Sequence, residues 1–93
     1  MNRVLLRSSA FIRVAKKIVK KQREKAEAIE TTLEMLAADA FDPQLRTHKL
    51  SGELAESWAC SGGYDLRIVF SFVQHEKVEA ILLESIGTHD EVY

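Results

Sequence analysis

The histidines and one arginine are the residues of this 93-residue chain best suited to moving protons and holding anions. His48 lies in a polar segment, Arg67 is two residues after Asp65, and His89 is close to the last residue. An imidazole with a pKa near ~6.5 can give or take a proton at neutral pH, and a guanidinium is a fixed, planar cation. Asp65 and Arg67 could instead form an ordinary surface ion pair, worth under ~1 kcal/mol. His75 is expected at a solvated hairpin tip.

Other kinds of site have little support in the sequence. The chain contains no HxH or HExxH motif and no second cysteine that could join His48 and His89 around a metal ion. Ser57, Ser61 and Cys60 lack the sequence context of a catalytic nucleophile. We therefore expect neither a metal nor another cofactor.

The N-terminal half is predicted to form one strand and two helices. Residues 3–7 favour a strand, and Ser8 or Ser9 can then cap a helix. Over residues 10–23 apolar side chains recur every three or four positions with basic ones between them, which is typical of an amphipathic helix with a basic outer face. A second helical pattern follows over residues 26–40.

Two boundaries of this helical half can be placed. No Gly or Pro separates the helices, and the break is expected around residues 21–24. Asp42-Pro43 should end the helical part, because the residue before a proline is disfavoured in the α conformation.

The C-terminal half alternates apolar and polar residues with the period of a β-strand. In residues 64–73 one face is apolar, whereas Asp65 and Arg67 belong to the other face. Strands are also expected at residues 57–60 and 78–86, joined by short turns. Short turns imply an antiparallel meander, so the predicted fold is α+β, with the helix pair packed on one face of the sheet.

Composition and charge limit the class of protein. Residues 1–93 fit a single domain, and the longest apolar run, residues 80–83, is far shorter than a membrane span. With one cysteine and no secretory pattern, a reduced, cytoplasmic domain is expected. Residues 1–25 hold nine of the 13 Lys and Arg residues and one acidic residue, so any polyanion should meet a local basic patch.

Three C-terminal segments resemble the RelE/YafQ family of bacterial toxins from type II toxin-antitoxin systems. They are His48-Lys49-Leu50-Ser51-Gly52-Glu53-Leu54-Ala55, Gly63-Tyr64-Asp65-Leu66-Arg67-Ile68-Val69-Phe70 with Trp58 before it, and Ile86-Gly87-Thr88-His89-Asp90-Glu91-Val92-Tyr93. The resemblance implies the RelE/ParE-like fold, with an N-terminal strand, a two-helix hairpin and an antiparallel meander. It also implies a ribosome-dependent, metal-independent endoribonuclease that cleaves mRNA and is inhibited by an antitoxin.

The same resemblance assigns catalytic roles to four residues. His89 matches the catalytic histidine of YafQ-like toxins and is expected to be the general acid. His48 is the first candidate for the general base, and Asp65 orients a histidine or replaces it as base. Arg67 matches the arginine that holds the scissile phosphate in RelE-like toxins. Ser61 stands where YafQ-like toxins have a further histidine.

RNA contacts are expected at four further residues. Tyr93 matches the C-terminal aromatic residue of the family, and Trp58 is a second candidate for stacking on a base. Arg46 and Lys49, on either side of His48, are expected to bind the RNA backbone.

Two alternatives to a ribonuclease remain open at this point. One is a ParE-like toxin that poisons DNA gyrase by binding, without catalysis. The other is a catalytically degenerate homologue that only binds an antitoxin.

Overall fold

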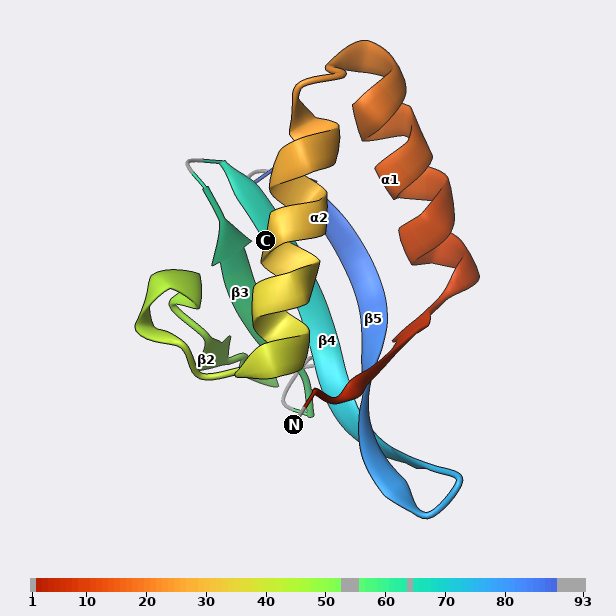
Figure 1. Cartoon of the computed structure of the whole chain (residues 1–93), viewed down its shortest axis with the longest axis vertical. Coiled ribbons are helices and arrows are strands. Elements are labelled where there is room, and N and C mark those ends of the chain that lie inside the picture. The colour runs from red at the N-terminus through yellow and green to blue at the C-terminus, as the bar shows by residue number, and fades with distance from the viewer. Residues whose placement is uncertain (1, 53–55, 64, 89–93) are drawn as a thin grey trace.

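The computed structural model describes residues 2–52, 56–63 and 65–88, and places two helices against a five-stranded sheet (Figure 1). The elements follow in the order β1 (Val4–Arg7), α1 (Ser9–Lys21), α2 (Lys25–Ala38), the 3₁₀ helix η1 (Pro43–Leu45), β2 (His48–Lys49), β3 (Trp58–Gly62), β4 (Leu66–His75) and β5 (Val78–Thr88). This order confirms the predicted α+β fold, and β2 is a short strand that the sequence pattern did not indicate.

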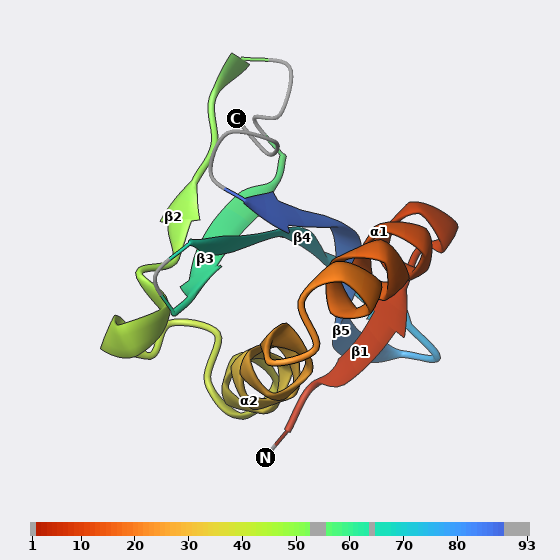
Figure 2. The same cartoon turned by 90° about the horizontal axis from the view of Figure 1, so that it is seen from above.

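The sheet is mixed, with the strand order β1-β5-β4-β3-β2. The strands β3 to β5 form the expected antiparallel meander, and β2 adds an antiparallel strand beside β3, whereas β1 pairs in parallel with β5. Seen from above, both helices lie on one side of the strands (Figure 2). The first strand of the sheet therefore forms its ladder with the last strand, β5.

Local sequence signals explain where the helices begin and end. Ser8 caps α1, since its Oγ accepts a hydrogen bond of 3.0 Å from the backbone N–H of Phe11. The helix ends at Lys21, where Gln22 N–H donates back to the carbonyl of Ile18 at 2.9 Å. The break before α2 thus falls at the predicted place. Among the described residues, no helix is long and apolar enough to cross a membrane.

The core lies between the helices and one face of the sheet. Leu66, Ile68 and Phe70 of β4 are almost fully buried and belong to one cluster with Leu33 and Leu36 of α2. The period-two pattern therefore assigned this face of β4 correctly.

Two boundaries around β4 differ from the sequence prediction. The strand begins at Leu66 instead of residue 64, and it continues through His75, which pairs with Val78. The hairpin turn consists of Glu76 and Lys77, with φ values of 51° and 70°. Such a tight two-residue turn with both φ positive matches the twist of the strands it joins, although Gly and Asn are the usual residues there.

Candidate active site

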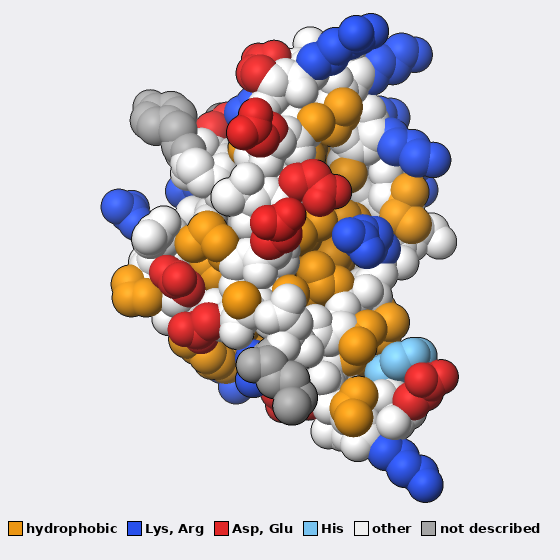
Figure 3. Space-filling view, in the orientation of Figure 1, with side chains coloured by type: hydrophobic (Ala, Val, Ile, Leu, Met, Phe, Trp, Pro, Cys, Tyr) orange, Lys and Arg blue, Asp and Glu red, His pale blue; other side chains and the backbone are white. Residues whose placement is uncertain are grey.

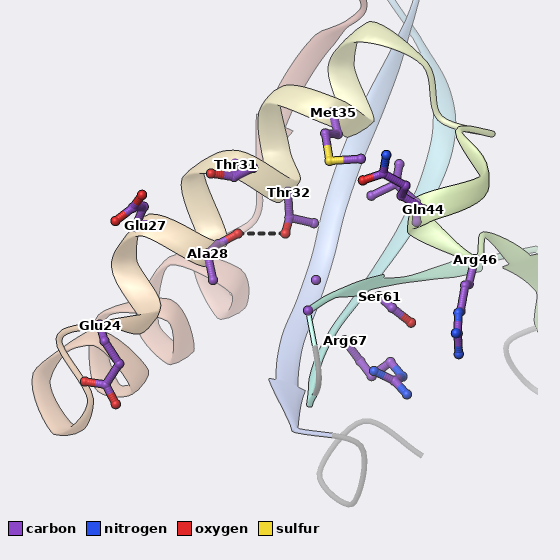
Figure 4. Close-up of a pocket in the computed structure, with 13 residues that line it drawn as sticks. Glu24, Glu27, Ala28, Thr31, Thr32, Met35, Gln44, Arg46, Ser61 and Arg67 are labelled. Carbon is purple, nitrogen blue, oxygen red and sulfur yellow. Dashed lines mark hydrogen bonds between the residues drawn. The ribbon is translucent and has the colours of Figure 1, made fainter.

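Two arginines and a serine converge at one end of the sheet. Ser61 of β3 is the register partner of Arg67 of β4, and Arg67 is in turn the partner of Gly87 of β5. Arg46 comes from outside the sheet, because it ends η1 in a left-handed conformation with φ 51°. Figure 4 shows the side chains of Arg46, Ser61 and Arg67 directed into the same space. The strand β4 and the end of η1 thus direct two guanidinium groups towards one region beside the Ser61 hydroxyl.

These three residues border an open hollow of about 800 Å³, which we call the arginine hollow. One wall is α2, and the other sides are η1 and the end of β3 (Figure 4). Acidic groups stand at its opposite end, where Glu24 and Glu27 belong to the lining. The positive end is the part of the hollow that can hold a phosphate group, since arginine binds phosphate oxygens through paired N–H donors.

Gly62 lets α2 lie close to β3 beside this hollow. A Cβ atom at residue 62 would stand 2.5 Å from Oγ1 of Thr32 and 2.9 Å from Cδ2 of Leu66. Thr32 has little freedom to move away, because it is buried and its hydroxyl donates a 2.7 Å hydrogen bond to the carbonyl of Ala28. The strand predicted at residues 57–60 left Gly62 in the turn after it, whereas β3 continues through Gly62. A glycine in a strand is a signal of close backbone approach.

His48 shares a sheet face with Arg67 but stands two strands away. Directly paired residues in an antiparallel ladder project to the same face, so His48 projects with Ala59, Ser61 and Arg67. Two strand spacings and two residue steps separate the Cα atoms of His48 and Arg67 by roughly 12 Å. A hydrogen bond of 3.1 Å joins Nδ1 of His48 to the carbonyl of Arg46. The imidazole is therefore tied to the segment that carries Arg46.

Asp65 lies outside the arginine hollow. It belongs to the turn before β4, so the alternation that predicted a common face for Asp65 and Arg67 does not reach residue 65. Instead, Asp65 lines a second hollow of about 420 Å³ with Leu66 and residues of α1. The adjacent residues Leu66 and Arg67 therefore border different hollows.

Trp58 and Lys49 are also placed away from Arg67. The Trp58 ring lies in a cluster with Phe41 and Phe72, with ring centroids 5.3 and 6.0 Å away. Nζ of Lys49 stands 5.8 Å from the centroid of the Trp58 ring. The structure therefore separates this predicted RNA-binding pair from Arg46, which does line the arginine hollow.

His89 and Tyr93 lie outside the described residues, so their predicted roles remain predictions. The strand that leads to them is described as far as Thr88, which pairs with Leu66. The preceding residue, Gly87, pairs with Arg67. The backbone therefore passes Arg67 immediately before it enters the C-terminal segment.

Cys60 is fully buried in β3, close to Arg67. Burial raises the pKa of the Cys60 thiol to about 12, and the nearby Arg67 guanidinium opposes this rise. A thiol with such a pKa is neutral and unreactive at physiological pH. Within the ranges that the structure describes, no group of three or more His, Cys, Asp or Glu residues is arranged to hold a metal ion.

Comparisons with known proteins now identify the family. The sequence model described as a bacterial toxin of a type II toxin-antitoxin system, YafQ, matches residues 3–93. The chain belongs to the YafQ toxin family. It is thus a toxin of the type II toxin-antitoxin class, as the C-terminal segments predicted. No curated protein sequence matches this YafQ-family toxin significantly.

Solved structures similar to this YafQ-family toxin confirm its fold. YafQ from Escherichia coli strain BL21(DE3) matches with a TM-score of 0.76 and 14% identity, covering 98% of both chains. The E. coli DinJ-YafQ toxin-antitoxin complex matches with a TM-score of 0.74 and 15% identity, over 100% of this chain and 99% of the other. A metal-bound toxin from Helicobacter pylori matches with a TM-score of 0.76 and 23% identity over the whole of both chains.

Proposed function

We propose that this YafQ-family toxin is an endoribonuclease that inhibits translation by cleaving mRNA on the ribosome without a metal ion. The observation that carries the proposal is that Arg46, Ser61 and Arg67 line one hollow, with Arg67 paired to Gly87 near the end of β5, two residues before His89 in the sequence. Two arginines and a histidine that act on one phosphate group supply positive charge and a proton donor.

The reaction proceeds by attack of the substrate's own 2′-hydroxyl on the adjacent phosphorus. A base takes the 2′-OH proton as the 2′-oxygen bonds to phosphorus, and the bond from phosphorus to the 5′-oxygen breaks. His89 donates a proton to that leaving oxygen, and Arg67 stabilises the charge on the phosphorane. The products are a 2′,3′-cyclic phosphate and a free 5′-hydroxyl, so no external reactant is consumed.

His48 and Asp65 are alternative general bases in this scheme. His48 is on the same sheet face as Arg67, whereas Asp65 lines the other hollow. We therefore favour His48. To act as the base, His48 has to reach the 2′-hydroxyl next to the phosphate that Arg67 holds, so the reacting group lies between the two side chains.

A protein partner completes the proposal. One of the matched structures is E. coli YafQ in complex with DinJ, a toxin-antitoxin pair. We expect this toxin to have its own antitoxin, encoded by a neighbouring gene, and to act in the cytoplasm where ribosomes and mRNA are found.

Expression in bacteria tests the proposed activity. Wild type, His89→Ala and Arg67→Ala are induced, and growth, protein synthesis and the DNA damage response are followed. A ribonuclease arrests translation in the wild type, and both substitutions relieve the arrest. A DNA damage response that persists in both variants would identify a ParE-like gyrase poison instead. Absence of toxicity in all three, with normal expression, would identify a degenerate homologue.

A further inference from the structure

The second hollow is lined by three lysines and by several apolar side chains. It lies between the C-terminal turns of α1, the first residue of α2 and the start of β4, and has a volume of about 420 Å³. We call it the lysine hollow. Its lining consists of Val14, Lys17, Ile18, Lys21, Gln22, Lys25, Asp65 and Leu66.

The lysines reach this hollow because of their spacing. Lys17 and Lys21 are four residues apart, which puts both on the same face of α1. Lys25 is the first residue of α2, after the short break that reverses the chain. With Asp65 as the one acidic lining residue, the lysine hollow favours a negatively charged occupant.

The apolar lining indicates which kind of anion fits. Val14 and Ile18 are half-buried on α1, and Leu66 is buried at the floor, 2% exposed. A phosphodiester backbone has no apolar group to place against these side chains. A protein segment in which carboxylates flank an aliphatic or aromatic side chain matches both the lysines and the apolar lining.

We propose that the lysine hollow is the docking site for an acidic, amphipathic segment of the antitoxin. This inference rests on the proposed function for the existence of an antitoxin. Carboxylates of the segment pair with Lys17, Lys21 and Lys25, and one apolar side chain packs against Ile18 and Leu66. The remaining basic residues of α1, among them Lys16 and Lys20, do not line the hollow and are left to face other partners.

Two matched double variants of α1 test the proposal. Lys17→Glu/Lys21→Glu reverses two charges at the hollow, and Lys16→Glu/Lys20→Glu reverses two outside it. All four lysines are exposed and lie on the same helix, so the two variants change net charge and helix environment equally. Each variant is produced with the protein encoded beside the toxin gene, and the Kd of the pair is measured at several salt concentrations. Toxicity is scored with and without that protein.

The proposal predicts a different result for each pair. Lys17→Glu/Lys21→Glu should raise the Kd roughly tenfold or more, with a weaker salt dependence, since repulsion replaces two ion pairs. It should stay toxic alone but escape neutralisation. Lys16→Glu/Lys20→Glu should change the Kd less than threefold. If the reversed pair does not fold, as judged by its melting temperature, Lys17→Gln/Lys21→Gln serves in its place.

Three outcomes would overturn the proposal. Equal weakening by the two double variants would mean that only overall charge matters. An unchanged Kd for Lys17→Glu/Lys21→Glu would remove the hollow from the interface. Loss of toxicity with normal antitoxin binding would make it an RNA contact. Because the Kd needs no catalysis, a toxin without nuclease activity would refute the proposed function and leave this inference intact.

Discussion

The arginine hollow and the lysine hollow are both lined by residues at the start of β4, where consecutive residues project to opposite faces of the sheet. Arg67 borders the first and Leu66 the second. In the arginine hollow, Arg67 is placed by strand register and Arg46 by the end of η1, whereas two of the three cations of the lysine hollow are lysines along one face of α1. Planar forks held by a sheet suit a phosphate whose geometry changes during a reaction, and mobile ammonium groups around apolar side chains suit a protein surface.

The face shown in Figure 3 also separates its charges. Lys and Arg side chains lie over α1, acidic side chains over α2, and hydrophobic side chains between them. Five of the nine basic residues among the first 25 belong to α1. Arg46 and Arg67 of the arginine hollow come from later in the sequence.

The largest expected effect is the fall in cleavage rate when the Arg67 guanidinium is removed. Arg67→Ala should reduce the rate of mRNA cleavage on programmed ribosomes by about 10²- to 10³-fold, as for loss of one donor to a transition-state anion. Arg67→Lys should restore only part of the rate, because a lysine keeps the charge but not the planar geometry. Lys77→Ala, which removes one positive charge at the distant hairpin turn, is the control and should leave the rate unchanged. Full activity of Arg67→Ala would remove the arginine hollow from the reaction.

A second expected effect concerns the close approach of α2 to β3 beside the arginine hollow. Gly62→Ala should lower the free energy of unfolding by about 1–3 kcal/mol in urea, because the new Cβ overlaps Thr32 and Leu66. The cost should be smaller in a Thr32→Ala background, since the nearest atom, Oγ1 of Thr32, is then absent. Additive effects of the two substitutions would show that α2 is not in close contact with β3 at this point.

The smallest expected effect is a dependence of stability on alkaline pH at Cys60. The folded pKa of about 12 lies above the model value of 9.0, so the unfolded chain releases the thiol proton first. Stability is therefore complete below pH 9 and falls as the pH rises towards 12, by roughly 1 kcal/mol at pH 10. Cys60→Ala lacks the thiol, so the difference between its stability profile and that of the wild type should show this loss above pH 9. Parallel profiles would mean that the thiol is not shielded behind the arginine hollow.

Sequence reasoning predicted the elements of the fold but not all of the contacts between them. Alternation assigned Leu66, Ile68 and Phe70 to the core, and the Ser8 cap fixed the start of α1. The pattern gave no sign that β1 pairs with β5, since strand partners distant in the sequence leave no local periodicity. Asp65 was misplaced for a related reason, because a period of two cannot show where a strand begins.

The site was predictable in its residue types and less so in its geometry. Arg67 was found from a strand pattern together with a family resemblance. The position of Arg46 depends on a left-handed backbone with φ 51°, which no local signal at that residue announces. The separation of Trp58 from Arg67 follows from their opposite sheet faces, a relation that appears only once β3 and β4 are paired in register.

The parallel pairing of β1 with β5 also bears on when the protein can first become harmful to its own cell. Val4–Arg7 has to wait for residues 80–83 before its hydrogen bonds can form. A nascent toxin chain therefore cannot close its sheet until β5 has been synthesised. The toxin in this way stays immature until this strand is available for pairing.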